Sequence, residues 1–328
     1  MATHNATRWL SEAVESVRCQ SFEDFEFLVV DDGSTDDTLD RLRDYAAMEP
    51  RIAVIAKEHT GLADSLNVGL KRSRGEWIAR LDADDVCEPT RLARQVRFAT
   101  TRPGVVLLGS GYLEIDEAGR MLKSHILKYR PKVLVRHLER YQQFFPHSSA
   151  FFRLSDALGV GGYNIRFARA QDIHLWRALS FRGDLACLPE PLVHIRVHPS
   201  QLSQDDGGLT QMTFAIAAIV SGWLQQLGKD DPSTSEDYSE WEIFLAWIRS
   251  RLEDSGFFEE RLIWMQARQS ALGKRRLPSR LVKFGKGILR SPKAGSLIWH
   301  KLVGYGVPKQ LAQEWVVQRS ASSGRRVR

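Results

Sequence analysis

Three aspartates follow a short strand-like segment in the first third of the chain. Asp82, Asp84 and Asp85 come directly after residues 77–81, in the run Leu-Asp-Ala-Asp-Asp. Grouped carboxylates repel one another unless a cation or hydrogen-bond donors hold them. A hard divalent cation, Mn²⁺ or Mg²⁺, would relieve this repulsion and keep coordination sites open for phosphate oxygens. The alternative for a lone Asp-x-Asp motif is a solvated acidic loop that caps the next helix.

A second acidic group ends another apolar run. Residues 25–30 predict a strand, and Asp31, Asp32 and Gly33 follow it directly. Ser34 can then cap a helix whose first turn carries two further aspartates, a favourable place for them at the positive end of the helix dipole. Open α/β sheets bind their ligands at the carboxyl ends of the strands. We therefore expect both acidic groups to lie at one ligand-binding edge.

Short apolar runs alternate with segments of helical periodicity up to about residue 112. The expected strands of this region are 25–30, 51–56, 77–81 and 105–108. Such alternation is typical of βα units around a parallel sheet. The sequence predicts the α/β class, with a Rossmann-like, mainly parallel sheet flanked by helices and a helical C-terminal extension.

The pattern divides the chain into three expected parts, 1–112, 113–204 and 205–328. The middle part is less regular than the first, and the last part is helical and aromatic. The elements expected in the middle part are a helix from Pro131, a loop at 146–149, a helix from Gln171 and a strand at 192–197.

Length and composition predict a stable globular protein. The chain has 328 residues, of which 43% are hydrophobic, enough to bury a substantial core. Its three cysteines, Cys19, Cys87 and Cys187, are widely spaced and are interpreted as reduced thiols. The N-terminus lacks the features of a signal peptide, and the most apolar stretch, 214–224, is too short to cross a bilayer. We therefore expect a cytoplasmic location.

Positive charge is concentrated at the C-terminal end. From Lys274 onward there are 14 Lys and Arg residues and one acid, Glu314, although the whole chain carries only +6. Apolar residues recur there at helical spacing among the basic ones: Leu281, Phe284, Ile288, Leu289, Trp299, Tyr305 and Trp315. This segment can make peripheral contact with an anionic membrane, or it can be a solvated helix packed on the core. No nucleic-acid recognition fold accompanies the charge, so no nucleic-acid partner is expected.

A series of short motifs resembles the inverting family 2 glycosyltransferases of GT-A fold in order and spacing. The resemblance covers residues 1 to about 204, and its specificity comes from the series as a whole. The matching motifs are Thr3-His4-Asn5, Asp31-Asp32-Gly33-Ser34, Gly61-Leu62, Asn67-Val68-Gly69-Leu70, Arg74 to Arg80, Asp82-Ala83-Asp84, Gly161-Gly162-Tyr163, Gln171-Asp172, Pro189-Glu190-Pro191-Leu192 and Arg196-Val197-His198-Pro199.

The resemblance implies that residues 1–112 bind a nucleotide-sugar donor and that 113–204 form the acceptor side. Asp32 matches the acid that accepts a hydrogen bond from the base, which suits N3–H of uracil, and His4 stands where the family has a residue against the base. Asp82 is expected to contact ribose or a metal-bound water. The nucleotide-binding residues implied in this way are Thr3, His4, Asn5, Asp32 and Asp82. An ordinary loop residue is the alternative for His4.

The resemblance also implies the metal ligands and the base. Asp84 matches the principal metal-binding acid, and His198 matches a histidine that completes the coordination shell of Mn²⁺ or Mg²⁺. The alternative for His198 is a structural role, in which its ring bonds to the backbone. Asp172 matches the catalytic base, which takes the acceptor proton as that oxygen attacks the anomeric carbon. Gln171 departs from the usual Glu, which puts acceptor contacts in doubt.

A second departure concerns the first strand. The family has an apolar strand before the Thr-x-Asn turn, whereas Met1 stands within that strand. Either the sheet lacks this strand or Met1 is an internal residue of a longer chain; we expect the second, because a missing central strand leaves ladder groups unpaired.

The function implied is inverting transfer of a sugar from a nucleotide-diphosphate donor, a UDP-sugar for preference, to a hydroxyl of a glycan or lipid-linked acceptor. The expected context is synthesis of a bacterial surface polysaccharide or glycoconjugate. One alternative is a non-catalytic nucleotide-sugar-binding module that lacks its first strand. A sugar-1-phosphate nucleotidyltransferase is a poorer match, since no glycine-rich loop followed by a basic residue opens the chain.

Overall fold

A computed structural model describes residues 1–128, 131–139, 144–201, 208–254 and 307–323. The chain divides into two compact units. The first comprises Met1–Leu138 and Gln142–Gln201, and the second comprises the short segment Glu139–Tyr141 and the chain from Leu202 onward.

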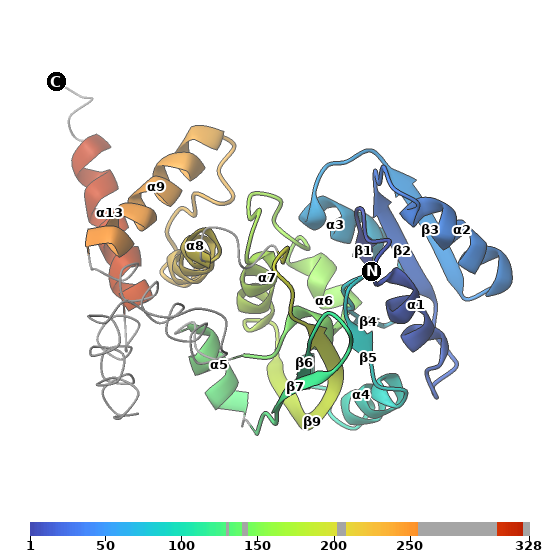
Figure 1. Ribbon diagram of the computed structural model, residues 1–328. Coiled ribbons are helices and arrows are strands. Elements are labelled where there is room, and N and C mark those ends of the chain that lie inside the picture. The colour runs from blue at the N-terminus through green and yellow to red at the C-terminus, as the bar shows by residue number, and fades with distance from the viewer. Residues whose placement is uncertain (129–130, 140–143, 202–207, 255–306, 324–328) are drawn as a thin grey trace, which may run out of the picture. The chain divides into compact units, whose positions relative to one another are not determined.

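The first unit begins with a small parallel sheet. Its strands β1 (Ala2–Thr3), β2 (Phe27–Asp32) and β3 (Ile52–Lys57) lie in the order β1-β2-β3, with Ala2 opposite Val30 and Val29 opposite Val54. Helices α1 (Leu10–Arg18), α2 (Thr38–Met48) and α3 (Leu62–Arg72) surround these strands (Figure 1). The predicted parallel βα arrangement is confirmed for this part of the chain.

Strand β2 is covered on both faces. Phe27 and Val29 pack in one cluster with Leu10 of α1 and Leu42 of α2. The opposite face carries Val30, which lies against Gly69 of α3. Burial on both faces explains why the run preceding Asp31 is continuously apolar. It also fixes the carboxyl end of β2, where the two aspartates begin.

The second sheet is mixed. Its order is β4-β8-β6-β9-β5, with β7 paired to β6, and of these pairs only β6–β9 is parallel. The parallel pairing expected from the sequence thus holds in the first sheet and between β6 and β9, and the other pairs of the second sheet are antiparallel. For β6 and β7 the reason is the tight turn that joins them, which allows only antiparallel pairing. The strands are β4 (Trp77–Ala79), β5 (Val86–Cys87), β6 (Val105–Ile115), β7 (Met121–His125), β8 (Phe151–Arg153) and β9 (Asp184–Arg196).

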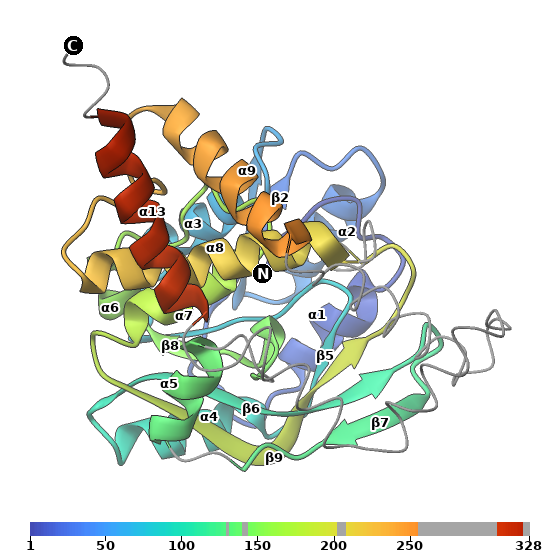
Figure 2. The ribbon, with the colours of Figure 1, turned by 90° about the vertical axis from the view of Figure 1, so that its left-hand side faces the viewer.

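Strands β6 and β9 are much longer than their apolar runs indicate (Figure 2). The polar and glycine positions after Leu108 interrupt the pattern, yet the pairing continues with register shifts around Gly111. A Cβ atom at Gly111 would lie 2.5 Å from the Pro189 carbonyl oxygen, so only glycine fits this close approach. The helices and turn around this sheet are α4 (Arg91–Thr100), α5 (Pro131–Glu139), η1 (His147–Ser149), α6 (Leu154–Gly159) and α7 (Gln171–Leu179).

A cavity of ≈ 670 Å³ is lined by residues of both β2 and β4. Among the described residues, β4 pairs only with β8, and β1 pairs with β2 at Val30 and Asp31. The Met1 amine lies at the cavity and donates to the Leu28 carbonyl oxygen at 2.9 Å. Burial, with a contribution from the charge of Arg80, lowers the pKa of this amine to about 5.

The described part of the second unit is helical. It comprises α8 (Leu209–Gln226), α9 (Tyr238–Asp254) and α13 (Val307–Ser323). Trp315 is 3% exposed and lies edge-on to Phe244 with ring centroids 5.0 Å apart, so it belongs to a core and not to a lipid-facing surface. The other members of the predicted membrane-binding segment, 281–305, lie outside the described residues. No helix among the described residues combines the length and apolarity needed to cross a bilayer.

Candidate active site

The Asp-x-Asp loop lies between β4 and β5. Asp82, Asp84 and Asp85 each place a carboxylate oxygen within 4.8 Å of the others. Ser148, from the turn before β8, holds the loop: its hydroxyl accepts from the Asp82 amide at 3.0 Å and contacts the carboxylates of Asp82 and Asp85. The polar loop at 146–149 predicted from the sequence therefore supports the acidic cluster.

The structure brings the two predicted metal ligands together. Nε2 of His198, just beyond β9, lies 2.9 Å from Oδ2 of Asp84. The ring is held by a contact of Nδ1 with the Ser200 hydroxyl at 2.8 Å and by the Trp9 ring, whose centroid lies 4.5 Å away. His198 thus bonds to an acidic side chain, whereas the alternative predicted a bond to the backbone.

The three carboxylates of the acidic cluster repel one another, so keeping all of them ionised costs free energy unless a positive charge lies beside them. Burial raises the pKa of Asp84, and the charge of Asp82 raises it further. Burial raises the pKa of Asp85 well above its usual range, with the charges of Asp84 and Asp82 adding to the shift. Burial acts in the same direction on Asp82, but the charge of Arg80 and the hydrogen bonds from Arg80 and Ser148 act against it, and the pKa of that carboxyl is lowered. Carboxylates suit Mn²⁺ or Mg²⁺, and imidazole is an acceptable further ligand for Mn²⁺, so these residues fit a hard divalent cation.

Arg196 holds the loop from behind. The Arg196 side chain is 0% exposed. Its Nε donates a hydrogen bond to the Asp84 carbonyl oxygen, and its backbone amide donates one to the Asp85 carboxylate, both at 2.9 Å. Its Nη1 donates to the carbonyl oxygens of Asp116 and Glu117, and its Nη2 pairs with Glu12 of α1 at 2.7 Å. One buried guanidinium therefore joins three segments, the acidic loop, the turn after β6 and α1, to the end of β9. The sequence did not reveal this role.

Asp172 stands in the first turn of α7. Its Oδ1 accepts from the backbone amide of Ile173 at 2.9 Å. Burial raises the pKa of Asp172, and the charge of Asp82 raises it further. The hydrogen bond from the Ile173 amide and the charge of Arg80 act in the opposite direction. Asp172 therefore lies within electrostatic reach of Arg80 and Asp82. A raised pKa suits a carboxylate that takes a proton. Gln171 beside it is buried.

Three further polar residues surround Asp172 and Asp82, and sequence reasoning gave them no role. Arg80 is 3% exposed; its Nη1 pairs with Asp82, and its Nε and Nη2 have no hydrogen-bond partner among the described residues. Nε2 of His147 lies 2.9 Å from the Tyr163 hydroxyl. Burial and the Arg80 charge lower the pKa of His147 well below its usual value, so this imidazole is neutral. Arg80 and Tyr163 belong to motifs that carry the resemblance, whereas the sequence signal for His147 was a polar loop between apolar segments.

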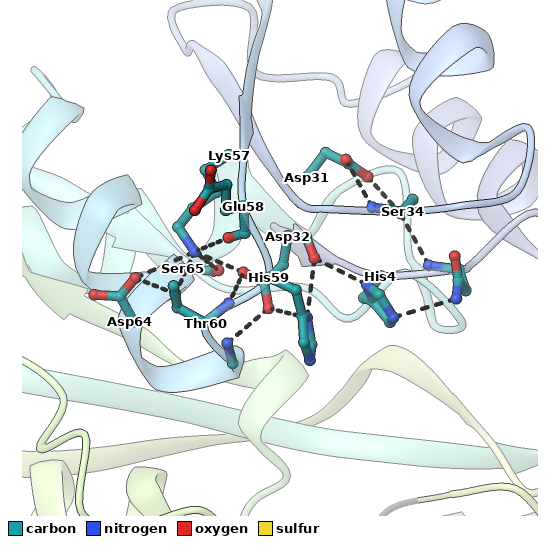
Figure 3. Close-up of polar contacts among 12 residues, drawn as sticks. His4, Asp31, Asp32, Ser34, Lys57, Glu58, His59, Thr60, Asp64 and Ser65 are labelled. Carbon is teal, nitrogen blue, oxygen red and sulfur yellow. Dashed lines mark hydrogen bonds and ion pairs between the residues drawn. The ribbon is translucent and has the colours of Figure 1, made fainter.

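The predicted nucleotide-binding residues of the first sheet meet at its carboxyl edge (Figure 3). Oδ1 of Asp32 accepts hydrogen bonds from Lys57 Nζ at 2.6 Å and from the Thr60 amide at 3.0 Å. Oδ2 of Asp32 accepts from the Gly61 amide at 2.9 Å and also contacts the His59 ring. Burial raises the pKa of Asp32, but the Lys57 and backbone hydrogen bonds outweigh it and hold that pKa well below its usual range. The Asp32 carboxylate is thus ionised and already has four donors.

The turn after β1 is locked to the turn after β2. Asn5 has a left-handed φ of 50°; its amide donates to the Ser34 hydroxyl at 2.9 Å, and its Oδ1 accepts from the Thr35 amide at 2.8 Å. Nδ1 of His4 lies 2.9 Å from the Asp32 carbonyl oxygen. The hydroxyl of Thr3 is buried without a partner among the described residues. The structure therefore places Thr3, His4, Asn5 and Asp32 together, and Asp82, Asp84 and His198 together.

Comparison with known proteins agrees with this architecture. The model of glycosyl transferase family 2 matches residues 1–160. The chain is 36% identical over 190 residues to the putative glycosyltransferase EpsE of Bacillus subtilis, an alignment that covers 56% of this chain and 67% of that protein. It is 29% identical over 201 residues to the amylovoran biosynthesis glycosyltransferase AmsE of Erwinia amylovora, covering 60% of this chain and 74% of that one.

The chain belongs to glycosyltransferase family 2. Solved glycosyltransferases share its fold. TarS of S. aureus, in complex with UDP, superposes with a TM-score of 0.55 at 19% identity, over 76% of this chain and 70% of that one. The mannosyltransferase PcManGT of Pyrobaculum calidifontis, with GDP-Man and Mn²⁺, gives 0.55 at 18% identity, over 92% and 83%. At this level of identity the likeness shows the GT-A fold, and the predicted family and fold class are confirmed.

Proposed function

We propose that this protein transfers a sugar from a nucleotide-diphosphate donor to a hydroxyl of a glycan or lipid-linked acceptor, with inversion and with a divalent metal. The observation that carries the proposal is the contact of Asp84 with His198 beside Asp82. UDP and UDP-GlcNAc in TarS structures, and GDP-Man with Mn²⁺ in PcManGT, support a nucleotide-sugar donor for the shared fold. AmsE, from amylovoran biosynthesis, supports a role in surface polysaccharide synthesis.

The roles of the residues follow from their chemistry. Asp84 and His198 would hold the metal, with Asp82 beside them; once bound, the metal neutralises charge on the leaving diphosphate. Asp172 would accept the acceptor's hydroxyl proton while that oxygen attacks the anomeric carbon. The acidic loop and the β1–β3 edge belong to the proposed donor half, 1–112, and Asp172 belongs to the proposed acceptor half, 113–204. Residues 205–328 form the proposed C-terminal extension.

Thermal stabilisation by nucleoside diphosphates tests the donor and the metal together. UDP should raise the melting temperature with Mn²⁺ and much less with EDTA, since a ligand at 100 times its Kd stabilises the folded state by about 2.7 kcal/mol. Equal shifts in both conditions would remove the metal from the proposal. Metal-dependent UDP binding with no transfer to any hydroxyl acceptor would favour the non-catalytic nucleotide-sugar-binding module instead.

A further inference from the structure

The β6–β7 hairpin exposes a group of apolar side chains. Among the described strands β7 pairs only with β6, so its outer edge is open (Figure 2). Met121 is 67% exposed, Leu122 56% and Ile126, just beyond the strand, 61%. Neighbouring strand residues point to opposite faces, so the exposure of both Met121 and Leu122 shows that both faces of the hairpin are open at this end. Scattered exposed apolar residues need no explanation, but a group of them marks an interaction surface. We call residues 120–128 the hairpin surface.

The same part of the chain carries positive charge without acids. Residues 118–138 contain no Asp or Glu but six Lys and Arg residues: Arg120, Lys123, Lys128, Arg130, Lys132 and Arg136. Lys123 on β7 and Lys128 after it are both exposed. The acid opposite Lys123 in the strand pair is Glu114, whose carboxylate contacts His125 at 3.0 Å. The hairpin surface therefore combines exposed apolar side chains with exposed cations.

The turn of the hairpin is fixed to the framework of the acidic loop. Oδ1 of Asp116 accepts from the amides of Ala118 and Arg120, both at 2.9 Å, which closes the turn. The carbonyl oxygens of Asp116 and Glu117 accept from Nη1 of Arg196, whose Nε donates to the Asp84 carbonyl oxygen. A partner bound to the hairpin surface would therefore be held at a set distance from the acidic loop.

We propose that the hairpin surface docks the protein on an anionic phospholipid membrane, with Met121, Leu122 and Ile126 in the interface and the lysines at the lipid headgroups. An anionic interface buries apolar side chains and attracts Lys and Arg, so it matches both features of this surface. The inference goes beyond the proposed function, because lipid binding needs neither donor nor metal. It also differs from the membrane contact that the sequence indicated, which involves residues 281–305.

Two other occupants match only one of these features. A nucleic acid would attract the cations but leave the apolar side chains exposed. A second copy of the chain, paired edge to edge along β7, would bury apolar groups. It would also bring two acid-free strands together, and like charges that face one another across a strand pair are destabilising.

Co-sedimentation of the full chain with lipid vesicles tests the proposal. One set of vesicles is phosphatidylcholine alone, and the other is an equal mixture of phosphatidylcholine and phosphatidylglycerol. The wild type should bind the anionic vesicles about tenfold or more tightly than the neutral ones, and this preference should shrink as salt screens the charges.

Two double variants separate the apolar and the charged contributions. Lys123→Gln with Lys128→Gln should weaken binding to the anionic vesicles by about tenfold or more, since each lysine near an anionic surface contributes about fivefold. Met121→Ser with Leu122→Ser should weaken it by about tenfold, because less apolar area enters the interface. The matched controls are Lys71→Gln with Lys229→Gln and Met48→Ser with Ile243→Ser, which change exposed residues elsewhere and should bind like the wild type.

Each contrary result overturns the proposal in its own way. If the wild type binds neither kind of vesicle, the hairpin surface is not a membrane contact. If it binds anionic vesicles but the hairpin variants bind them as well as their controls do, the contact lies elsewhere in the chain. If only the lysine variant loses affinity, the apolar side chains do not enter the interface. If light scattering shows a dimer that Met121→Ser with Leu122→Ser dissociates, the occupant is a second copy of the chain.

Discussion

Nε2 of His198 lies 2.9 Å from Oδ2 of Asp84, although 114 residues separate them in the chain. The contact joins the segment after β9 to the loop between β4 and β5. Both side chains offer metal-ligand atoms, and the carboxylates of Asp82 and Asp85 lie beside them. This pair is therefore the point at which the proposed donor-binding chemistry can be tested most directly.

The first prediction concerns the metal ligand. Asp84→Ala should abolish the Mn²⁺-dependent stabilisation by UDP and leave the fold intact, because the side chain is half-buried in an acidic loop and not part of the core. Thermal melting with Mn²⁺ or EDTA measures this. Asp40→Ala is the matched control, since the Asp40 side chain is 80% exposed on α2 and pairs only with Arg43 in the described structure. An undiminished Mn²⁺ effect in Asp84→Ala would exclude Asp84 as a ligand.

The second prediction separates donor binding from chemistry. Asp172→Asn keeps the shape of the side chain but cannot take a proton, so transfer should fall by roughly 10²–10⁴-fold while UDP and metal binding stay nearly normal. Turnover with the natural acceptor and calorimetry with UDP are the two measurements.

Gln171→Glu is the companion variant of Asp172→Asn. It restores the acid usual in the family and should change acceptor affinity more than turnover. Near-normal turnover in Asp172→Asn would exclude Asp172 as the base, and joint loss of binding and turnover would make Asp172 a structural residue.

The third prediction concerns pH. Burial raises the pKa of Asp172 in the folded protein, so this carboxyl is protonated, and unable to act as a base, up to a higher pH than an ordinary aspartate with its pKa of about 3.9. The acidic limb of the pH profile of kcat/KM, which reports groups of the free enzyme, should therefore lie above that value, with kcat/KM falling as pH falls through it. Circular dichroism over the same range shows whether the fold persists. A limb at the ordinary aspartate value would contradict the assignment.

The fourth prediction tests the buried arginine. Arg196→Met should lower the free energy of unfolding by about 3 kcal/mol, because the carbonyl oxygens of Asp84, Asp116 and Glu117 lose their donor. Glu12→Gln is the comparison, since it removes only the 56% exposed partner of the ion pair and should cost no more than about 1 kcal/mol. Urea denaturation measures both. Equal, small losses would mean that Arg196 does not organise the loop.

The fifth prediction uses the cavity between β2 and β4. A short apolar extension ahead of Met1 should raise stability, because it can pair with both strands and each side chain that it buries contributes about 1.5–3 kcal/mol. It also replaces the buried amine, whose pKa is lowered to about 5, by an amide. Melting temperatures should rise for the apolar extension and not for a Gly-Ser extension of equal length. If both extended chains melt like the unextended one, the cavity does not accept a strand.

Sequence reasoning could predict the local features of the site. The Asp-x-Asp loop and Asp31-Asp32 were visible because an apolar run, a turn and a helix start are decided within a dozen residues. The ends of β2 and β3 were predicted to within about two residues for the same reason. Strand β9 was predicted only from residue 192, because its first half is held by pairing with β6 and not by local pattern.

By itself, the sequence determined the α/β class, the family and the acidic residues, since all of these are written in local periodicity and in motif order. Only the tertiary structure decided that Asp84 meets His198, that Arg196 joins the acidic loop to α1 and to the turn after β6, and that the Asp32 carboxylate has four donors. Those contacts join residues far apart in the chain, so they depend on strand register and packing. The same long-range packing brings the rings of His4 and His59 to a centroid distance of 4.3 Å at the edge of the first sheet.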